Sequence, residues 1–257
     1  MGHIRLGRLP KRWGWLQVFR ALEDECNDPE LIAQVVAHAA ARDLERLRQA
    51  PAAVAGPIWL LAYIANGSGQ SDFAGLLDDV GVPSRSLDSS IAFIAALSDV
   101  EAIDSPAAQS VFESFARLSL RDALSEHFAG RTSSLFGSTK DDVISVCAEL
   151  SKPKVFGSVA RRYFASFSFR LLRYVVDREA SNVLFQHSSQ RDSADLISLE
   201  KRLASYCFDS ARIVEDFAAS WFSKWRHLEG GSISVDSALG FTGYALRKLE
   251  MELGQLQ

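Results

Sequence analysis

Residues 155–185 read VFGSVARRYFASFSFRLLRYVVDREASNVLF, and this stretch decides the fold. Its apolar side chains recur at spacings of three and four, which is one face of an α-helix. That face holds Phe156, Val159, Ala160, Tyr163, Phe164, Phe167, Leu171, Tyr174 and Val175, and a second set on the opposite side holds Phe169, Leu172 and Val176. A helix that is apolar on nearly all sides needs neighbours on several of them. The stretch therefore predicts the central core helix of the C-terminal half.

Charged side chains interrupt this helix, so it is not a transmembrane span, which needs about 20 apolar residues in a row. One quadrant of the helix holds a stripe formed by Arg162, Arg170, Arg173 and Asp177. Arginines on a core helix must be paired, reach water or bind an anion. Two interpretations stay open. The stripe forms ion pairs within the chain, with Asp177 or the acidic segment 72–104, or its arginines bind a phosphate or an acidic partner.

The composition is that of an ordinary globular protein. The chain has 257 residues, of which 47% are apolar and 23% charged, and its formal net charge is −4. A nucleic-acid-binding field over the whole surface is excluded, so such binding would need a local basic patch. Cys26, Cys147 and Cys207 lie far apart without a CxxC motif, which indicates buried, reduced thiols. With no signal-peptide pattern, we expect a cytoplasmic protein without a membrane span.

The first 20 residues form a separate basic segment. The segment has no Asp or Glu, and its basic residues are Arg5, Arg8, Lys11, Arg12 and Arg20. Gly2, Gly7 and Pro10 predict an extended arm before a helix that begins near Arg12. Either the arm packs on the body of the protein, or it docks on an acidic protein surface or on phosphates. In the second case Trp13 and Trp15 would serve as stacking or burial platforms.

Further helices are predicted along the rest of the chain, several of them opened by a capping residue or by Asp-Pro or Ser-Pro. Their expected ranges are 28–50, 58–65 after Pro57, 71–80, 86–98, 105–129, 139–152 ended by Pro153, 193–225 and 234–253. The helices at 155–185 and 193–225 are joined by a polar hinge, which predicts an antiparallel hairpin.

The expected fold is therefore all-α, a multi-helix, bundle-like protein with a long antiparallel C-terminal helical hairpin and an extended basic N-terminal arm. A loop rich in Ser, Thr and Gly at 131–138 marks the expected domain boundary. It divides the chain into residues 1–136, with the arm and short helices, and residues 137–257, with the hairpin.

Aromatic residues recur in steps of four in the second hairpin helix, at Phe217, Trp221 and Trp225, with Phe222 beside them. They either pack in the core against the last helix or form an exposed hot spot for a partner, since interfaces favour tryptophan. Trp221 and Trp225 are the candidate interface residues of this region.

No catalytic motif is present in the sequence. GxSxG, GxGxxG, the P-loop and HExxH are all absent, and no two histidines are at HxH or HxxxH spacing. We therefore assign no catalytic, cofactor-binding or metal-binding residue and expect no cofactor.

Three short motifs carry a resemblance. GHIRLGRLPK stands at residues 2–11, WFSK at 221–224 and GFxxYALxKLxxEL at 240–253. They resemble bacterial helical proteins of unassigned function, which are similar to accessory subunits of anti-phage defence systems. The resemblance implies no activity and no site residue.

The sequence thus leads to the hypothesis of a non-enzymatic subunit or adaptor of a bacterial multiprotein assembly that binds a protein partner. The alternative is a nucleic-acid-binding accessory protein that uses the basic arm and Arg162, Arg170 and Arg173. No oligomeric state is predicted.

Overall fold

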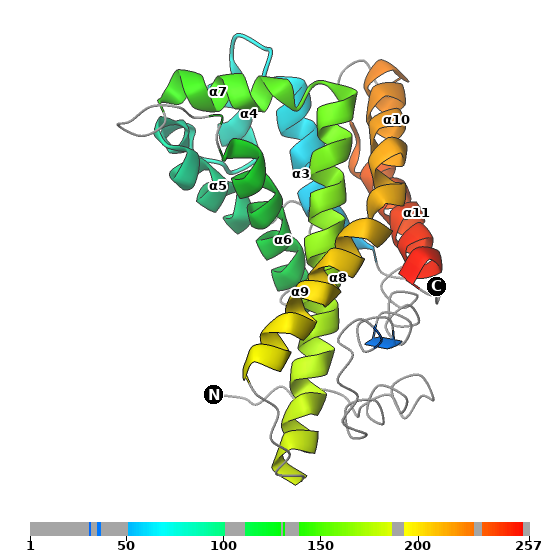
Figure 1. Ribbon diagram of the computed structural model, residues 1–257. Helices are drawn as coiled ribbons and strands as arrows, with labels where there is room; N and C mark the ends of the chain where they lie inside the picture. Colours follow the sequence, from blue (N-terminus) through cyan, green and yellow to red (C-terminus); the bar gives the residue numbers. More distant parts are fainter. Residues whose placement is uncertain are drawn as a thin grey trace.

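The computed structural model describes residues 31, 35–36, 51–100, 111–129, 131, 139–186, 193–228 and 233–253, with side chains except at residues 175, 177–186 and 193–196. Within these ranges all regular secondary structure is helical (Figure 1). The all-α prediction is confirmed. The predicted arm, most of the helix at 28–50 and the hinge at 187–192 lie outside the described residues.

The helices are bounded as follows: α3 Ala52–Gly67, α4 Phe73–Asp79, the 3-10 helix η1 Ser84–Asp88, α5 Ser90–Asp99, α6 Val111–Phe128, α7 Lys140–Glu149, α8 Pro153–Gln186, α9 Ser193–Ser210, α10 Arg212–Leu228 and α11 Val235–Leu253.

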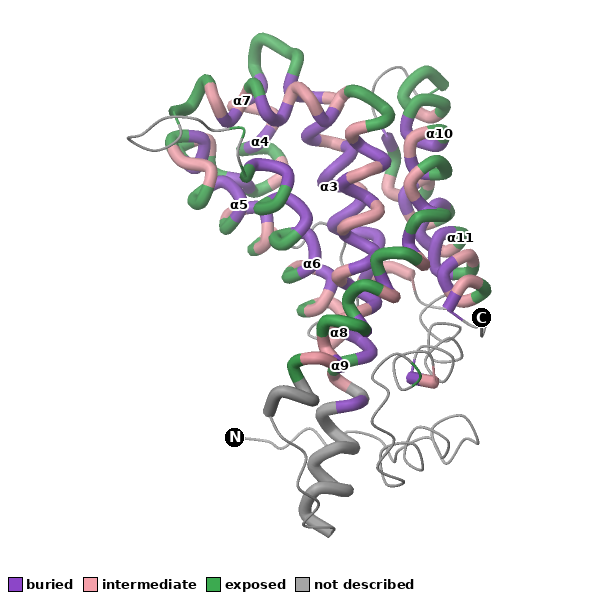
Figure 2. The backbone as a smooth tube through the Cα atoms, viewed as in Figure 1, coloured by how far each residue is buried: buried purple, intermediate pink, exposed green. Residues whose placement is uncertain are grey.

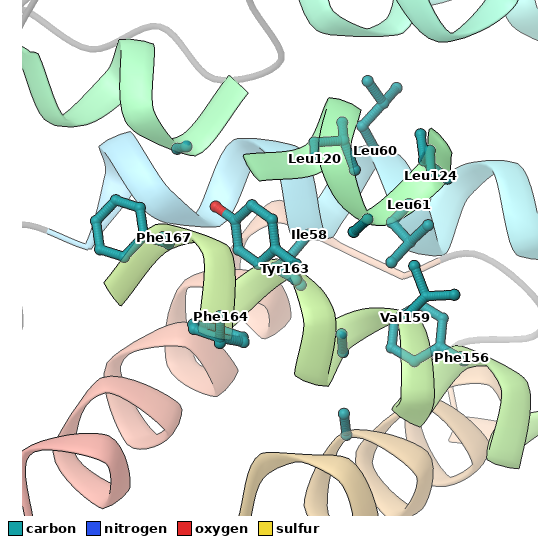
Figure 3. Close-up of a cluster of buried hydrophobic side chains, with 14 of the residues drawn as sticks. Ile58, Leu60, Leu61, Leu120, Leu124, Phe156, Val159, Tyr163, Phe164 and Phe167 are labelled. Carbon is teal, nitrogen blue, oxygen red and sulfur yellow. The ribbon is translucent and has the colours of Figure 1, made fainter. Parts of the chain in front are cut away.

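Helix α8 is the central element of the molecule, as the sequence predicts. It has 34 residues and is about 50 Å long. It packs against α3, α6, α9 and α10, and Figure 1 shows α5 and α6 on one side of it and α10 and α11 on the other. Figure 3 shows its buried side chains, among them Phe156 and Tyr163, against those of α3 and α6. The Tyr163 hydroxyl donates a hydrogen bond to the Val54 carbonyl at 2.7 Å, which joins α8 to α3.

The second arm of the hairpin is two helices, not one, so the prediction of a continuous helix over 193–225 is wrong. α9 and α10 are separated by a turn at the buried residue Ala211 and both pack on α8. Carbonyls in the last turn of a helix need new partners. One of them, the Phe208 carbonyl, accepts a hydrogen bond from Arg161 Nε of α8 at 3.2 Å. The turn is thus stabilised by a side chain from another helix.

Two prolines do not mark the boundaries that local rules predict. α3 begins at Ala52, and Pro57 lies buried inside it. An internal proline costs about 3 kcal/mol, but eleven of the sixteen residues of α3 are buried, and their burial outweighs that cost. Pro153 does not end the preceding helix, because α7 already ends at Glu149 and Pro153 is the first residue of α8. Proline is favoured at that position.

The predicted helix over 86–98 is also divided. Ser89 is extended, and it separates η1 from α5. The helices predicted at 71–80 and 234–253 are confirmed as α4 and α11.

The buried hydrophobic residues form one cluster, and Figure 2 marks the buried positions along the backbone in purple. Helices that precede and follow residues 131–138 share it, because α6 packs on α8 and α3 on α11. Trp59 Nε1 of α3 also donates a hydrogen bond to the Ile233 carbonyl, just before α11, at 3.0 Å. The division of the chain at residue 136 stays a prediction. No helix in the described ranges is long and apolar enough to cross a membrane.

Candidate functional site

The arginine stripe of α8 forms ion pairs with two neighbouring helices. Arg162 Nε lies 2.9 Å from Glu126 Oε1 of α6, and Arg170 pairs with Asp122, also of α6. Asp122 accepts a second hydrogen bond from the Ser166 hydroxyl at 2.7 Å. The partners belong to α6, which the sequence did not identify as the acidic side of these pairs.

The third arginine of the stripe pairs with α9. Arg173 Nη2 lies 3.0 Å from Glu200 Oε1, and both side chains are nearly half exposed. The side chain of Asp177 lies outside the described part of the protein. The three arginines therefore connect α8 to α6 and α9, and each already has a carboxylate partner within the chain.

Arg161, which the sequence did not identify as a site residue, lies on the other flank of α8. Its guanidinium is 4.0 Å from the centre of the Phe208 ring and 3.0 Å from Glu215 of α10. With the bond to the Phe208 carbonyl, this side chain contacts both helices at the Ala211 turn. The sequence around Arg161 does not indicate that it contacts α9 and α10, because its partners Phe208 and Glu215 are about 50 residues away in sequence.

The aromatic residues of α10 are divided between core and surface. Trp221 is 7% exposed and stacks on Phe241 of α11, with ring centres 4.5 Å apart. Trp225 is half-buried, and Lys224 Nζ lies 5.7 Å from the centre of its ring. The core-packing interpretation therefore describes Trp221.

The exposed aromatic pair of this region is Phe217 of α10 with Tyr244 of α11. Their rings stack with centres 4.1 Å apart, and their side chains are 37% and 38% exposed. Phe217 also stacks on Phe241, which continues the contact to Trp221. Phe217 and Tyr244, and not Trp221, are thus the exposed rings of α10 and α11 in the described part of the chain. Tyr244 is the fifth residue of the GFxxY motif, which could have identified it.

More exposed apolar side chains lie along the same two helices. Ile213 and Phe217 are one turn apart on α10, and Leu228 ends that helix, while Met251 is two turns beyond Tyr244 on α11. Lys248 Nζ lies 5.5 Å from the centre of the Tyr244 ring. We call this surface the α10–α11 seam; its residues are Ile213, Phe217, Lys224, Leu228, Tyr244, Lys248 and Met251. Figure 2 shows exposed residues along the outer sides of both helices.

Three titratable side chains of the described core, Cys147, Cys207 and His127, are buried. Burial raises the pKa of the Cys147 and Cys207 thiols, so both are neutral at physiological pH and are poor nucleophiles. His127 is 1% exposed, and burial lowers its pKa although its ring contacts the Val146 carbonyl at 3.4 Å. In the described ranges no group of three or more His, Cys, Asp or Glu side chains is arranged to hold a metal ion.

The N-terminal candidates Arg5, Arg8, Lys11, Arg12, Trp13 and Trp15 lie outside the described residues, so their roles stay predictions. No family model, no curated protein and no solved structure matches the chain.

Proposed function

We propose that this protein is a non-enzymatic helical subunit or adaptor of a cytoplasmic bacterial multiprotein assembly, such as an anti-phage defence system. The observation that supports this proposal is the α10–α11 seam. Its exposed apolar residues are 37–60% accessible, and two of them, Phe217 and Tyr244, stack on each other across the contact of α10 with α11. Exposed apolar surface that is contiguous and bordered by polar groups is typical of protein interaction sites.

The test is affinity purification of the tagged protein from its own host, with and without nuclease, followed by mass spectrometry. We expect stoichiometric partner proteins that remain bound after nuclease treatment. Recovery of the protein alone, as a stable monomer, would contradict the proposal.

A second function is favoured by the charge of residues 1–20, which include cations but no acid. It is binding of nucleic acid through Arg5, Arg8, Lys11 and Arg12, with the stripe arginines as further contacts. The expected result is an affinity that falls steeply with salt, because bound phosphates release counterions. An Arg5→Glu/Arg8→Glu variant should then lose binding, and an affinity independent of salt would contradict this function.

A further inference from the structure

The charge of the α10–α11 seam indicates which kind of partner it fits. Both charged members of the seam, Lys224 and Lys248, are cations, and each lies beside an aromatic ring of its own helix. A lysine in this position covers apolar surface with its stem and keeps its ammonium group in water. The seam therefore combines an apolar centre with positive charge.

Two acidic side chains of the same helices interact with groups outside the seam. Glu215 pairs with Arg161 of α8. Burial raises the pKa of Tyr206 of α9, and Cys207 and Glu252 add to this effect, so Glu252 lies near Tyr206. Asp216 is exposed and lies about 100° around α10 from Phe217 and three residues after Ile213, and Asp236 is exposed in the first turn of α11. Glu215 and Glu252 are thus engaged outside the seam, whereas Lys224 and Lys248 lie beside aromatic rings.

This charge pattern disfavours a second copy of the chain as the occupant. In a two-fold symmetric dimer the same patch meets itself, and the lysines of one copy would face a surface that is also positive. A partner with carboxylates beside its apolar side chains is complementary instead.

The shape of the seam favours a helix over a nucleic acid. Aliphatic side chains at Ile213, Leu228 and Met251 extend the seam along the axes of α10 and α11. Ile213 and Phe217 are one turn apart and Tyr244 and Met251 two turns apart, and such whole-turn spacings match the anchors of an amphipathic helix that lies along a helical surface. The exposed rings of Phe217 and Tyr244 already stack on each other, which leaves less ring face for bases.

We propose that the α10–α11 seam binds an acidic amphipathic helix of a partner protein. The apolar face of that helix covers Ile213, Phe217, Tyr244 and Met251, and its Asp or Glu side chains pair with Lys224 and Lys248. This inference rests on the proposed adaptor function and specifies the partner of its surface.

The experiment is a selection from a display library of helical peptides of 17 residues, the length of α10, on the full chain. Peptides that also bind an Ile213→Asp/Met251→Asp variant are removed. The affinities of the remaining peptides for the full chain are then measured by fluorescence anisotropy. We expect enriched peptides with apolar residues at i, i+3, i+4 and i+7 and with Asp or Glu beside them. Their affinity should fall about tenfold or more in the Ile213→Asp/Met251→Asp variant.

Matched variants separate the seam from the rest of the surface. Ile91→Asp replaces an aliphatic side chain that is 80% exposed on α5, and it should leave peptide affinity unchanged. The Lys224→Glu/Lys248→Glu variant should have a lower affinity for the acidic peptides and should bind peptides in which their Glu residues are replaced by Lys. The control Lys201→Glu, at an exposed position of α9, should change neither affinity.

Several results would overturn the inference. They are enrichment of peptides without an acidic excess, equal binding by the Ile213→Asp/Met251→Asp variant, or tight binding of a single-stranded oligonucleotide that Lys224→Glu/Lys248→Glu abolishes. A concentration-dependent dimer that Ile213→Asp abolishes would also overturn it, in favour of a second copy. If purification from the host yields a nuclease-resistant partner while the selection fails, the adaptor function stands and only the acidic helix is rejected.

Discussion

Gly157 lies where α8 packs against α10, and it leaves no room for a side chain. A Cβ atom at this position would be 2.4 Å from the Glu215 carbonyl oxygen and 3.1 Å from the Ala219 Cβ. The first of these atoms belongs to the backbone, so it cannot move without shifting α10. The glycine thus sets the separation of the two helices.

We expect Gly157→Ala to lower the free energy of unfolding by about 1–3 kcal/mol, because the added methyl group overpacks the contact. The measurement is urea denaturation. Gly240→Ala is the matched control, since its Cβ would meet nothing within 4 Å and alanine is the better helix former by about 1 kcal/mol. Equal effects of the two substitutions would show that α8 and α10 are not in close contact.

His127 predicts a specific pH dependence of stability. Burial lowers its pKa, an effect that Arg131 and Arg162 increase and that the Val146 carbonyl and Glu149 oppose. Because the folded pKa lies below the ordinary value of 6.5, its stabilising contribution is present above pH 6.5. That contribution is lost as the pH falls through the lowered folded pKa.

The expected result is a loss of unfolding free energy between about pH 7.5 and about pH 5.5 that is smaller in a His127→Gln variant. Glutamine stays neutral over this range and can still donate to the Val146 carbonyl. Urea titrations at both pH values measure the difference. An unchanged pH dependence in His127→Gln would mean that this histidine titrates equally in the folded and unfolded chains.

For single residues, the sequence showed that aromatic side chains recur along α10 but not which of them are exposed. The spacing of Phe217, Trp221 and Trp225 places them on related sides of a helix, yet it does not say which side another helix covers. α11 covers Trp221 and leaves Phe217 partly exposed. Tyr244 was missed because its stacking partner is 27 positions away.

At the scale of elements, helix starts governed by local hydrogen bonds were predictable. The Thr139 hydroxyl accepts from the Asp142 amide at 3.2 Å, and Asp142 accepts from the Thr139 amide at 2.9 Å. This reciprocal capping box needs only residues that are three apart. The break at Ala211 was not predictable in this way, because no glycine or proline marks it and Arg161 of α8 supports it.

The contact of α6 with α8 yields a prediction about the arginine stripe. In a double-mutant cycle with Arg162→Ala and Glu126→Ala, we expect a coupling of about 0.2–1 kcal/mol, the range of partly exposed ion pairs. Thermal denaturation of the four variants measures it.

The same pair also tests the anion-binding alternative. If Arg162 is occupied by Glu126, added phosphate at constant ionic strength should leave the wild-type Tm unchanged. A phosphate-dependent rise in Tm that Arg162→Ala removes would show that this guanidinium binds an anion in place of its carboxylate partner.

At the scale of the whole molecule, the shared core predicts cooperative unfolding. α3 and α6, which precede residues 131–138, pack on α11 and α8, which follow these residues. We expect one calorimetric transition in which the calorimetric and van't Hoff enthalpies agree. Two resolved transitions would instead support the domain boundary predicted at residue 136.

The sequence predicted the all-α class and the central position of α8 because both follow from periodicity within one segment. It did not predict that α3 packs on α11, which involves residues as far apart as Trp59 and Ile233. Such pairings depend on how several apolar faces fit together, and one-dimensional patterns do not contain that information.

The rings of Tyr244, Phe217, Phe241 and Trp221 stack in series, so the intrinsic fluorescence of Trp221 reports on this part of the protein. The indole nitrogen of Trp221 is buried with no acceptor among the described residues, so its emission depends on packing at this place. In a variant with Trp13, Trp15 and Trp59 replaced by phenylalanine, tryptophan fluorescence would come from Trp221 and Trp225 alone. Occupation of the surface above them would then change the colour and intensity of fluorescence without any attached dye.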